Sequence, residues 1–424
     1  MTSTPRRRRA GSLLAVVVPA LVAGLLIVAA TFVPAQQPLA RVVDAGPTVQ
    51  TRACAFTGAP GALVVSGAEV ETTLLDGQVI DDPSINGAVT GSVVLRASGE
   101  QPLTAGVRSQ SSAGLMWAEC RPPATTGSLL LPDPATAEVV LVNPDRTDAG
   151  VNISLSGATG QIQSPGLRGI VVPAGAMVRV PISVHAPAGE PVTATYQTSH
   201  GRVQAAVRSL TAAPEQAVAT APQRVAVFAA VPTQPTGVRL LLHNPGDERA
   251  EVTIELLGPR GRFAPANGAA SLAPHTTVAI DLGAAFTEQD MGLVVTGSSE
   301  VLSMLTTQGA NDIAWMLPDE AATDLMDAVP EGTLQVVNPS PDEASVTMVQ
   351  VHPDGTADAP QTITIPAGAS GQFAVVAGQV RITSTAPIAA AVRVAGTGQA
   401  VSRVRPPAGV VVPEPGTMDP QLAQ

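Results

Sequence analysis

The run Val140-Leu141-Val142-Asn143-Pro144 is apolar up to an Asn-Pro turn, and the pattern returns as Leu240-Leu241-Leu242-His243-Asn244-Pro245 and Gln335-Val336-Val337-Asn338-Pro339. In each copy an Ala follows the Asn by six residues and a Val follows it by eight: Ala149 and Val151, Ala250 and Val252, Ala344 and Val346. The Val begins a run in which apolar and polar residues alternate, which is typical of a strand with one buried face. The sequence therefore predicts a strand–turn–strand unit that repeats about every 95–100 residues.

The repeat extends well beyond this turn. A turn proline follows 28 to 30 residues after the Asn, at Pro173, Pro274 and Pro366. Two closing strands are then expected in each copy, at Val192–Tyr196 and Val203–Val207, Leu293–Thr296 and Val301–Leu305, and Val380–Thr383 and Ile388–Val392. A reduced copy precedes them, with early strands at Leu63–Val65 and Glu69–Leu75, and it places Trp117 where the third copy has Trp315. Packing is the expected role of both tryptophans.

Short strands separated by Gly and Pro turns favour a β-sandwich in each copy. The predicted fold is all-β, with tandem immunoglobulin-like β-sandwich modules after one N-terminal transmembrane or signal helix. Pro-containing joints are expected at Arg121–Ala124, Thr211–Gln223 and Leu317–Glu331. The expected parts are a basic tail (1–9), the helix (10–35), a linker (36–51), a reduced first module (52–123), three full modules (124–222, 223–320 and 321–405) and a disordered Pro-rich tail (406–424).

The chain resembles bacterial immunoglobulin-like extracellular modules, in which an apolar strand ends in an Asn-containing turn, an alternating strand follows and a Pro-Gly-type turn comes later. The likeness covers most of residues 125–405. The whole layout is similar to an uncharacterised family of actinobacterial membrane-anchored or secreted envelope proteins. This resemblance implies a fold and an envelope location, and it implies no activity.

The N-terminus carries a membrane-targeting signal. Four arginines, Arg6–Arg9, precede an uncharged apolar run from Ala10 to Ala35. About 20 apolar residues suffice to cross a bilayer as a helix, and the positive-inside rule places the arginines in the cytoplasm. We expect either an uncleaved anchor or a signal cleaved near Ala35. In both cases the rest of the chain lies outside the cytoplasm.

The two cysteines, Cys54 and Cys120, bracket the first module. An extracytoplasmic compartment permits disulfides, so we expect these two residues to be bridged. In the loop-entropy model, closing a loop of this length stabilises the fold by about 4 kcal/mol.

Composition excludes several classes of function. The formal net charge is −11, and all 23 basic residues are Arg. Without lysine, Schiff-base chemistry and a phosphate-binding P-loop lysine are excluded. An acidic body repels phosphate backbones, so nucleic acid is not an expected partner. Gly-x-Ser-x-Gly, His-Glu-x-x-His and Gly-x-Gly-x-x-Gly motifs are absent from the sequence.

Acidic residues recur after each Asn-Pro turn, and they are the weak candidates for Ca²⁺ ligands, because hard cations prefer clustered oxygen atoms. These residues are Asp145, Asp148, Asp247, Glu248, Asp342 and Glu343. The alternative is a solvated polar turn. A second acidic cluster, Asp319, Glu320, Asp324 and Asp327, falls in an expected linker. The five histidines are scattered, so a metal site, a cofactor and a catalytic group are not expected.

The sequence favours a non-enzymatic cell-envelope protein, a rod or compact stack of modules that acts as a scaffold, spacer or docking module. A fold unit repeats here without any repeated reactive group. The first alternative is a module that binds an envelope glycan or a peptide. The second is a hydrolase with dispersed acidic residues, which the scarcity of aromatic residues (2%) disfavours because sugar subsites commonly use aromatic faces.

Overall fold

The alternating and fully apolar runs form strands throughout the described part of the chain. The computed structural model describes residues 49–407, except for 57–59, 68, 76, 81–86, 100, 233–234, 287–290 and 353–354. These residues form strands β1 to β31 and two short 3-10 helices, η1 (Pro165–Leu167) and η2 (Gly283–Ala285), with no α-helix among them. The prediction of an all-β protein is confirmed.

The first group of strands forms two antiparallel sheets, with the orders β1-β5-β3 and β4-β2-β6-β7. Its strands are β1 (Val49–Cys54), β2 (Gly61–Ser66), β3 (Val70–Leu74), β4 (Gly87–Val89), β5 (Val93–Ser98), β6 (Thr104–Ser111) and β7 (Gly114–Glu119). The two early strands expected in the reduced copy correspond to β2 and β3.

The second group also forms two sheets, β11-β10-β14-β8 with β12 beside β10, and β13-β9-β15-β16. Its strands are β8 (Thr126–Leu131), β9 (Ala137–Val142), β10 (Ala149–Gly157), β11 (Gly160–Ile162), β12 (Ile170–Val172), β13 (Met177–Pro181), β14 (Val192–His200), β15 (Gln204–Ser209) and β16 (Gln216–Val218). Along β10, Val151, Ile153 and Leu155 are buried while Asn152 and Ser154 are exposed, as the alternation predicts.

In the third group one long strand, β23 (Gly292–Gln308), serves two sets of neighbours. Its first part pairs with β17 and β19, and its second part pairs with β18 and β24. The other strands are β17 (Gln223–Phe228), β18 (Gly237–His243), β19 (Ala250–Gly258), β20 (Gly261–Phe263), β21 (Ala269–Leu272), β22 (Thr277–Asp281) and β24 (Ile313–Met316).

The fourth group has the same construction, with β30 (Gly378–Val394) as its long strand. The other strands are β25 (Ala322–Val329), β26 (Gly332–Val337), β27 (Ala344–Val351), β28 (Gln361–Ile365), β29 (Ser370–Val375) and β31 (Val401–Val404). The prediction of two separate closing strands is therefore wrong in the third and fourth copies. Polar stretches such as Ser298–Glu300 bend the strand with a register shift in place of ending it.

The strand order differs from the immunoglobulin order, in which strands A, B, E and D share one sheet and C, F and G share the other. In the second group the first strand, β8, pairs with β14, and β15 pairs with β9. Relative to the immunoglobulin order, the first and last strands of the unit have exchanged sheets. The finer prediction of immunoglobulin-like modules is not confirmed.

The repeated Asn explains why the repeated sequence folds alike in three places. Asn143 is fully buried, and its Nδ2 donates to the carbonyl oxygens of Thr147 (2.8 Å) and Val172 (3.0 Å). Its Oδ1 accepts a hydrogen bond from the backbone N–H of Asp145 (3.0 Å). Asn244 and Asn338 are also fully buried and make the equivalent bonds, to Glu248, Leu272 and Gly246 and to Asp342, Ile365 and Ser340. One side chain thus holds its own turn and fastens it to the strand before the turn proline.

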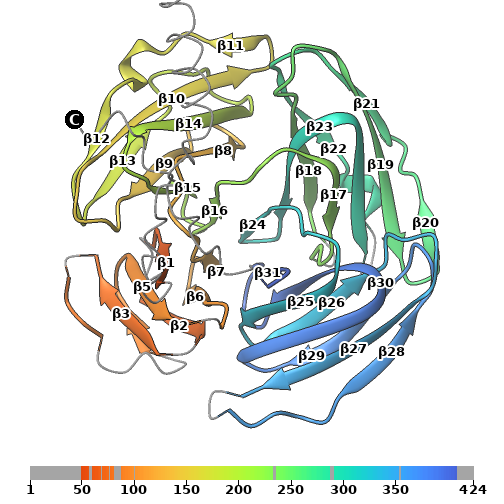
Figure 1. The fold of residues 1–424 in the computed structure, drawn as a ribbon. Coiled ribbons are helices and arrows are strands. Elements are labelled where there is room, and N and C mark those ends of the chain that lie inside the picture. The colour runs from red at the N-terminus through yellow and green to blue at the C-terminus, as the bar shows by residue number, and fades with distance from the viewer. Residues whose placement is uncertain are drawn as a thin grey trace, which may run out of the picture. The chain divides into compact units, whose positions relative to one another are not determined.

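The four groups close into a ring within the unit of residues 47–411 (Figure 1). Apolar clusters join each group to the next: Ala53, Ala55, Val140, Val142 and Ala206 between the first and second; Val227, Ala229, Leu257, Val294, Val337 and Ala389 between the third and fourth. Leu241, Leu302 and Met304 of the third group extend the core of the second. A further cluster, of Val64, Leu115, Trp117, Ala328, Val394 and Ala400, joins the fourth group to the first. Because this last cluster joins the fourth group back to the first, the groups form a compact arrangement and not a rod.

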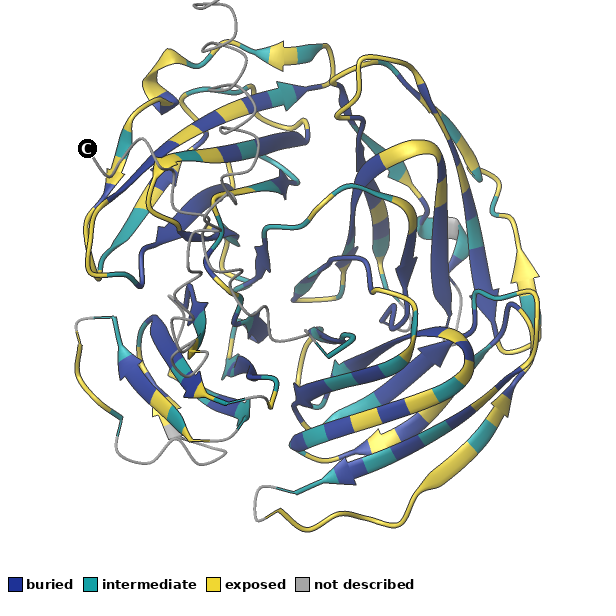
Figure 2. Ribbon diagram, viewed as in Figure 1, coloured by how far each residue is buried: buried dark blue, intermediate teal, exposed yellow. Residues whose placement is uncertain are grey.

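Ring closure buries both faces of the strands near the centre. Every residue of β9 is buried: Val139 and Leu141 face the core of their own group, and Val140 and Val142 face the first group. Outer strands such as β20 and β28 keep exposed residues (Figure 2). The joints expected at residues 211–223 and 317–331 contain strands β16 and β25, respectively.

The predicted disulfide between Cys54 and Cys120 is confirmed. Both cysteines are fully buried in the core of the first group, and the bridge spans 66 residues. It ties β1 to the segment that follows β7, where Ala53 and Arg121 also exchange backbone hydrogen bonds.

The expected basic tail (1–9), the helix (10–35), most of the linker (36–51) and nearly all of the Pro-rich tail lie outside the described residues. Among the residues described, no helix is long and apolar enough to cross a bilayer.

Candidate functional site

Four short strands, one from each group, surround the centre of the ring. They are β7, β16, β24 and β31, and each forms an antiparallel pair with the last long strand of its group. Trp117, Gln216, Trp315 and Val401 hold matching places in these pairs, opposite Arg108, Arg208, Thr306 and Arg393. The residues two positions further on are Glu119, Val218, Leu317 and Arg403. Both sets line a central cavity of about 20 Å³. That volume holds about one water molecule, so side chains fill the centre.

A buried ion pair joins the first and last of these central strands. The Arg403 guanidinium donates to both carboxylate oxygens of Glu119 at 2.7 and 2.6 Å, and also to the carbonyl oxygen of Pro318 at 3.0 Å. The two side chains are only 9% and 12% exposed. Burial alone would raise the pKa of Glu119, but Arg403, Arg405 and Arg121 outweigh it and lower that pKa to about 2. Glu119 is therefore charged at every physiological pH.

Arg405 and Asp327 form a second buried pair next to the first. Arg405 Nε lies 2.7 Å from Asp327 Oδ2, and Arg405 Nη1 lies 3.8 Å from Glu119 Oε2. Burial lowers the pKa of Arg405, but Asp327 and Glu119 outweigh this effect and raise it. Arg52 of β1 lies close enough that burial and the charge of Arg405 lower its pKa to about 10. The two ends of the described chain thus meet in one charged cluster.

Arg121 is the unpaired member of this cluster. Within the described residues its guanidinium has no hydrogen-bond partner, and the side chain is half-buried. Burial, followed by the charges of Arg405 and Arg403, lowers the pKa of Arg121 to about 9. Arg52 acts in the same direction, and the charge of Glu119 opposes these effects without outweighing them.

Arg121, Arg403 and Arg405 belong to the lining of a pocket of about 500 Å³, which we call the arginine pocket. The rest of the lining comes mainly from the second group and mixes apolar residues, such as Pro122, Ala219 and Pro222, with polar ones: Thr126, Ser128, Tyr196, Gln204 and Thr220, with Glu320 from the segment before β25. Gln204 is 2% exposed, its Nε2 donates to Ala205, and its Oε1 has no partner. Tyr196 is 2% exposed and belongs to the core of the second group; its ring packs against Gly127, where a Cβ would lie 2.8 Å from the ring.

Asp319 lies next to Pro318 at the edge of this cluster. Its Oδ2 accepts a hydrogen bond from the backbone N–H of Ala229 at 2.7 Å, while its buried Oδ1 has no partner. Burial raises the pKa of Asp319 to about 7, against the opposing effects of the Ala229 bond and Arg403. This carboxyl group therefore titrates near neutral pH.

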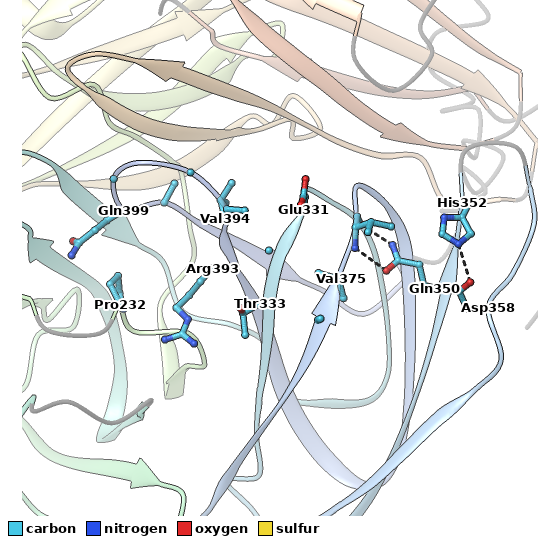
Figure 3. A pocket seen from close by; sticks show the side chains of 17 residues that line it. Pro232, Glu331, Thr333, Gln350, His352, Asp358, Val375, Arg393, Val394 and Gln399 are labelled. Carbon is cyan, nitrogen blue, oxygen red and sulfur yellow. Dashed lines mark hydrogen bonds and ion pairs between the residues drawn. The ribbon is translucent and has the colours of Figure 1, made fainter.

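A larger pocket, of about 1000 Å³, lies in the fourth group between the ends of β26, β27, β29 and β30 (Figure 3). Its polar side chains are largely engaged with the protein. Gln350 exchanges hydrogen bonds with the backbone of Val376, and His352 Nε2 lies 2.9 Å from Asp358 Oδ1. Gln399, at the opposite end, accepts a hydrogen bond from Thr307. This pocket has a mainly polar lining.

The model of a family of unknown function, DUF5719, matches residues 76–377. The chain belongs to DUF5719. The match covers more than two thirds of the sequence, and within DUF5719 it includes Glu119, Arg121, Asp319 and Asp327 but ends before Arg403 and Arg405. No curated protein matches this DUF5719 chain.

Among solved structures, the DUF5719 chain is similar to an alpha-L-rhamnosidase from Streptomyces avermitilis complexed with L-rhamnose, at 10% identity. The alignment covers 85% of this chain and 55% of the enzyme, so the chain spans about half the length of that protein. The TM-score is 0.12, which is too low to support any inference about fold or activity.

The structure separates the calcium candidates of this DUF5719 chain and engages several of them. Asp145 pairs with Arg202 at 2.8 Å, Asp148 accepts a hydrogen bond from the backbone of Ala174, and Asp247 lies 2.9 Å from His275. The backbone carbonyls of Glu248 and Asp342 accept bonds from the repeated Asn side chains, and Glu343 is exposed. In the described ranges no three His, Cys, Asp or Glu side chains gather as metal ligands would. The calcium hypothesis gains no support from this geometry.

The sequence did not indicate the charged cluster. Its defining contact joins Glu119 to Arg403 across 284 residues, with no shared motif. The one available signal is the run of acidic residues from Asp319 to Asp327, which the sequence places in a linker; Asp319 precedes β25 and Asp327 lies within it, and both are buried, at 3% and 2% exposure. Trp117 and Trp315 do hold equivalent packed places, as the repeat predicts.

Proposed function

We propose that this member of DUF5719 is a non-enzymatic, extracytoplasmic docking protein of the cell envelope, tethered or exported through residues 10–35. The observation that carries the proposal is the closure of the ring through the Glu119–Arg403 pair, which fastens the first and last groups together. A partner that binds such a body does not have to order it first, and this lowers the free-energy cost of association. The buried disulfide is consistent with an oxidising, extracytoplasmic setting.

Rigidity also fits the way the groups share their cores. Leu241 and Met304 belong to the third group but pack in the core of the second, so neighbouring groups cannot swing apart without exposing apolar surface. The composite surface of the ring is then presented as one unit. A scaffold or docking role makes direct use of such a surface.

The test is saturable binding of the tagged ectodomain, residues 47–424, to washed envelope fragments. The wild type is compared with Glu119→Gln, which loosens the ring, and with Asp324→Asn, which removes one member of an exposed ion pair with Arg381. We expect saturable binding by the wild type and Asp324→Asn and weaker binding by Glu119→Gln. Non-saturable binding by all three proteins, or turnover of glycoside or peptide substrates by the wild type, would overturn the proposal.

A binding module for an envelope glycan is the second candidate, and the arginine pocket favours it. Arg121, Arg403 and Arg405 line one pocket in a chain whose formal net charge is −11. Arg403 and Arg405 are paired with Glu119 and Asp327, and Arg121 has no ion pair in the described part of the chain, so an anionic ligand would supply the counter-charge that Arg121 lacks.

A further inference from the structure

The arginine pocket lies where the connections between the four groups converge. Its lining takes residues from each connection: Arg121, Pro122 and Ala124 between the first and second groups, 219–222 between the second and third, and Pro318 and Glu320 between the third and fourth. Arg403 and Arg405 come from the end of the fourth group. The pocket therefore exists only in the closed ring and belongs to no single group.

The Arg121 guanidinium has no ion-pair partner in this pocket. Within the described part of the chain it makes no hydrogen bond and no ion pair, whereas Arg403 pairs with Glu119 and Arg405 pairs with Asp327. Arg121 is half-buried and belongs to the pocket lining. Its pKa, lowered to about 9 by burial and by its cationic neighbours, keeps the side chain charged at neutral pH. An unpaired charge in a partly buried site is unfavourable, and a bound anion would relieve it.

The charges around the pocket leave room for a single negative charge. The cations are Arg52, Arg121, Arg403 and Arg405, and the acids are Glu119, Asp327 and the exposed Glu320 of the lining. Asp319 is protonated below about pH 7, so it does not change this balance there. Four positive charges thus stand against three negative ones. A ligand with one negative charge neutralises the pocket, whereas a second charge would be repelled by Glu320.

The lining is better suited to a peptide than to a sugar. Tyr196, the one aromatic residue of the lining, is 2% exposed, so no aromatic face is open to a sugar ring. Pro122 and Ala221 offer exposed apolar surface, and the polar residue Thr126 is exposed beside them. Small apolar and hydroxyl groups of this kind can contact the short side chains of a peptide.

We propose that the arginine pocket binds one carboxylate of a peptide or protein partner, held by the guanidinium of Arg121 with Arg405 beside it. This rests on the proposed docking function and specifies the chemistry of the partner. A planar carboxylate carries one charge and matches the fork of an Arg guanidinium. The acidic body, with a net charge of −11, repels a run of acids, so the partner presents an isolated Glu or Asp.

The test is calorimetric titration of the full ectodomain at pH 6 and constant ionic strength. The probe is the peptide N-acetyl-Ala-Glu-Ala-amide, and its uncharged match is N-acetyl-Ala-Gln-Ala-amide. We expect saturable binding of the Glu peptide and binding of the Gln peptide that is weaker by a factor of about ten or more. Equal binding of the two peptides would refute the role of the carboxylate.

Two further probes test the class of ligand. Inorganic phosphate and D-glucuronate should both bind more weakly than the Glu peptide. Tighter binding of phosphate would refute the preference for a carboxylate. Tighter binding of glucuronate would refute the assignment to a peptide and would support the glycan candidate instead.

Matched variants locate the binding. Arg121→Met removes a guanidinium that no acid of the described chain pairs with, so the variant should unfold in urea no more easily than the wild type and bind the Glu peptide more weakly by a factor of about ten or more. Glu320→Gln removes the competing carboxylate and should bind the Glu peptide more tightly. Arg168→Met makes the same charge change as Arg121→Met at an exposed residue outside the pocket and should bind like the wild type.

Two results would overturn the inference. One is wild-type affinity for the Glu peptide in both Arg121→Met and Glu320→Gln. The other is saturable binding to envelope fragments by a protein that does not bind the Glu peptide. In that second case the docking proposal stands and only the carboxylate site fails.

Discussion

Replacing Glu119 with Gln tests whether a buried charge pair holds the ring closed. The change leaves Arg403 without its carboxylate at a site where the two side chains are only 9% and 12% exposed, so solvent screens the loss poorly. Breaking a buried pair by removing one partner typically costs about 3–5 kcal/mol. The pKa of Glu119 indicates a free-energy cost of the same size. Its fall from 4.5 to about 2 corresponds to about 3 kcal/mol, at roughly 1.4 kcal/mol for each tenfold change in proton affinity. We therefore expect the free energy of unfolding to fall by about 3 kcal/mol.

The assay is urea denaturation of the ectodomain at pH 7, followed by fluorescence of Trp117 and Trp315, which line the same central cavity. The pKa of Glu119 is lower in the folded than in the unfolded protein, so its contribution is complete above about pH 4.5 and disappears as the pH falls toward 2. The difference between the wild type and Glu119→Gln should shrink over that range. Asp324→Asn, in a pair that is 58% and 40% exposed, should cost less than about 1 kcal/mol. A cost for Glu119→Gln no larger than that of Asp324→Asn would refute the reasoning.

Three further predictions concern other parts of the fold. Replacing Cys54 and Cys120 together with Ser should lower the free energy of unfolding by about 4 kcal/mol under oxidising conditions, whereas wild type and variant should unfold alike in excess reductant. Asn244→Ala removes the donor to Glu248 and Leu272 and the acceptor for Gly246, so urea denaturation should show a free energy of unfolding lower by roughly 2–4 kcal/mol. A smaller loss than that of the control Asn152→Ala, at an exposed position, would contradict the role assigned to the repeated Asn. Burial raises the pKa of Asp319 to about 7, so the free energy of unfolding should fall as the pH rises from about 4 to about 7. Asp319→Asn should remove this pH dependence and be more stable than the wild type at pH 8 by roughly 2–4 kcal/mol. An unchanged, wild-type pH profile of the variant's stability would rule this out.

The repeat was predictable because its determinants are local. Asn143, Asn244 and Asn338 bond within a span of about 30 residues, so the spacing of Asn, Ala, Val and Pro in the sequence is the spacing of the contacts themselves. Strand positions such as Val151, Val252 and Val346 followed from alternation, and each is buried as expected. Local chemistry is what a single sequence displays best.

The ring was not predictable, because its contacts are long-range and its strands break the alternation rule. Val140 and Leu241 are buried on faces that alternation would leave to solvent, and each packs on a neighbouring group. A continuous apolar run indicates burial on both sides without saying by what. The candidate site was hidden for the same reason: Arg121 and Arg403 belong to different groups and meet only when the ring closes.

The closed circuit of β7, β16, β24 and β31 has an evolutionary consequence. An open array of repeats can gain or lose a member, because each member contacts only its neighbours and the two ends of the array remain unpaired. Here Arg403 of the last member pairs with Glu119 of the first, and within the described ranges it forms no ion pair with another carboxylate. Duplication or deletion of a repeat would place Arg403 beside a different neighbour and leave its charge unpaired. We therefore expect the number of repeats to change only together with the residues of the four central strands.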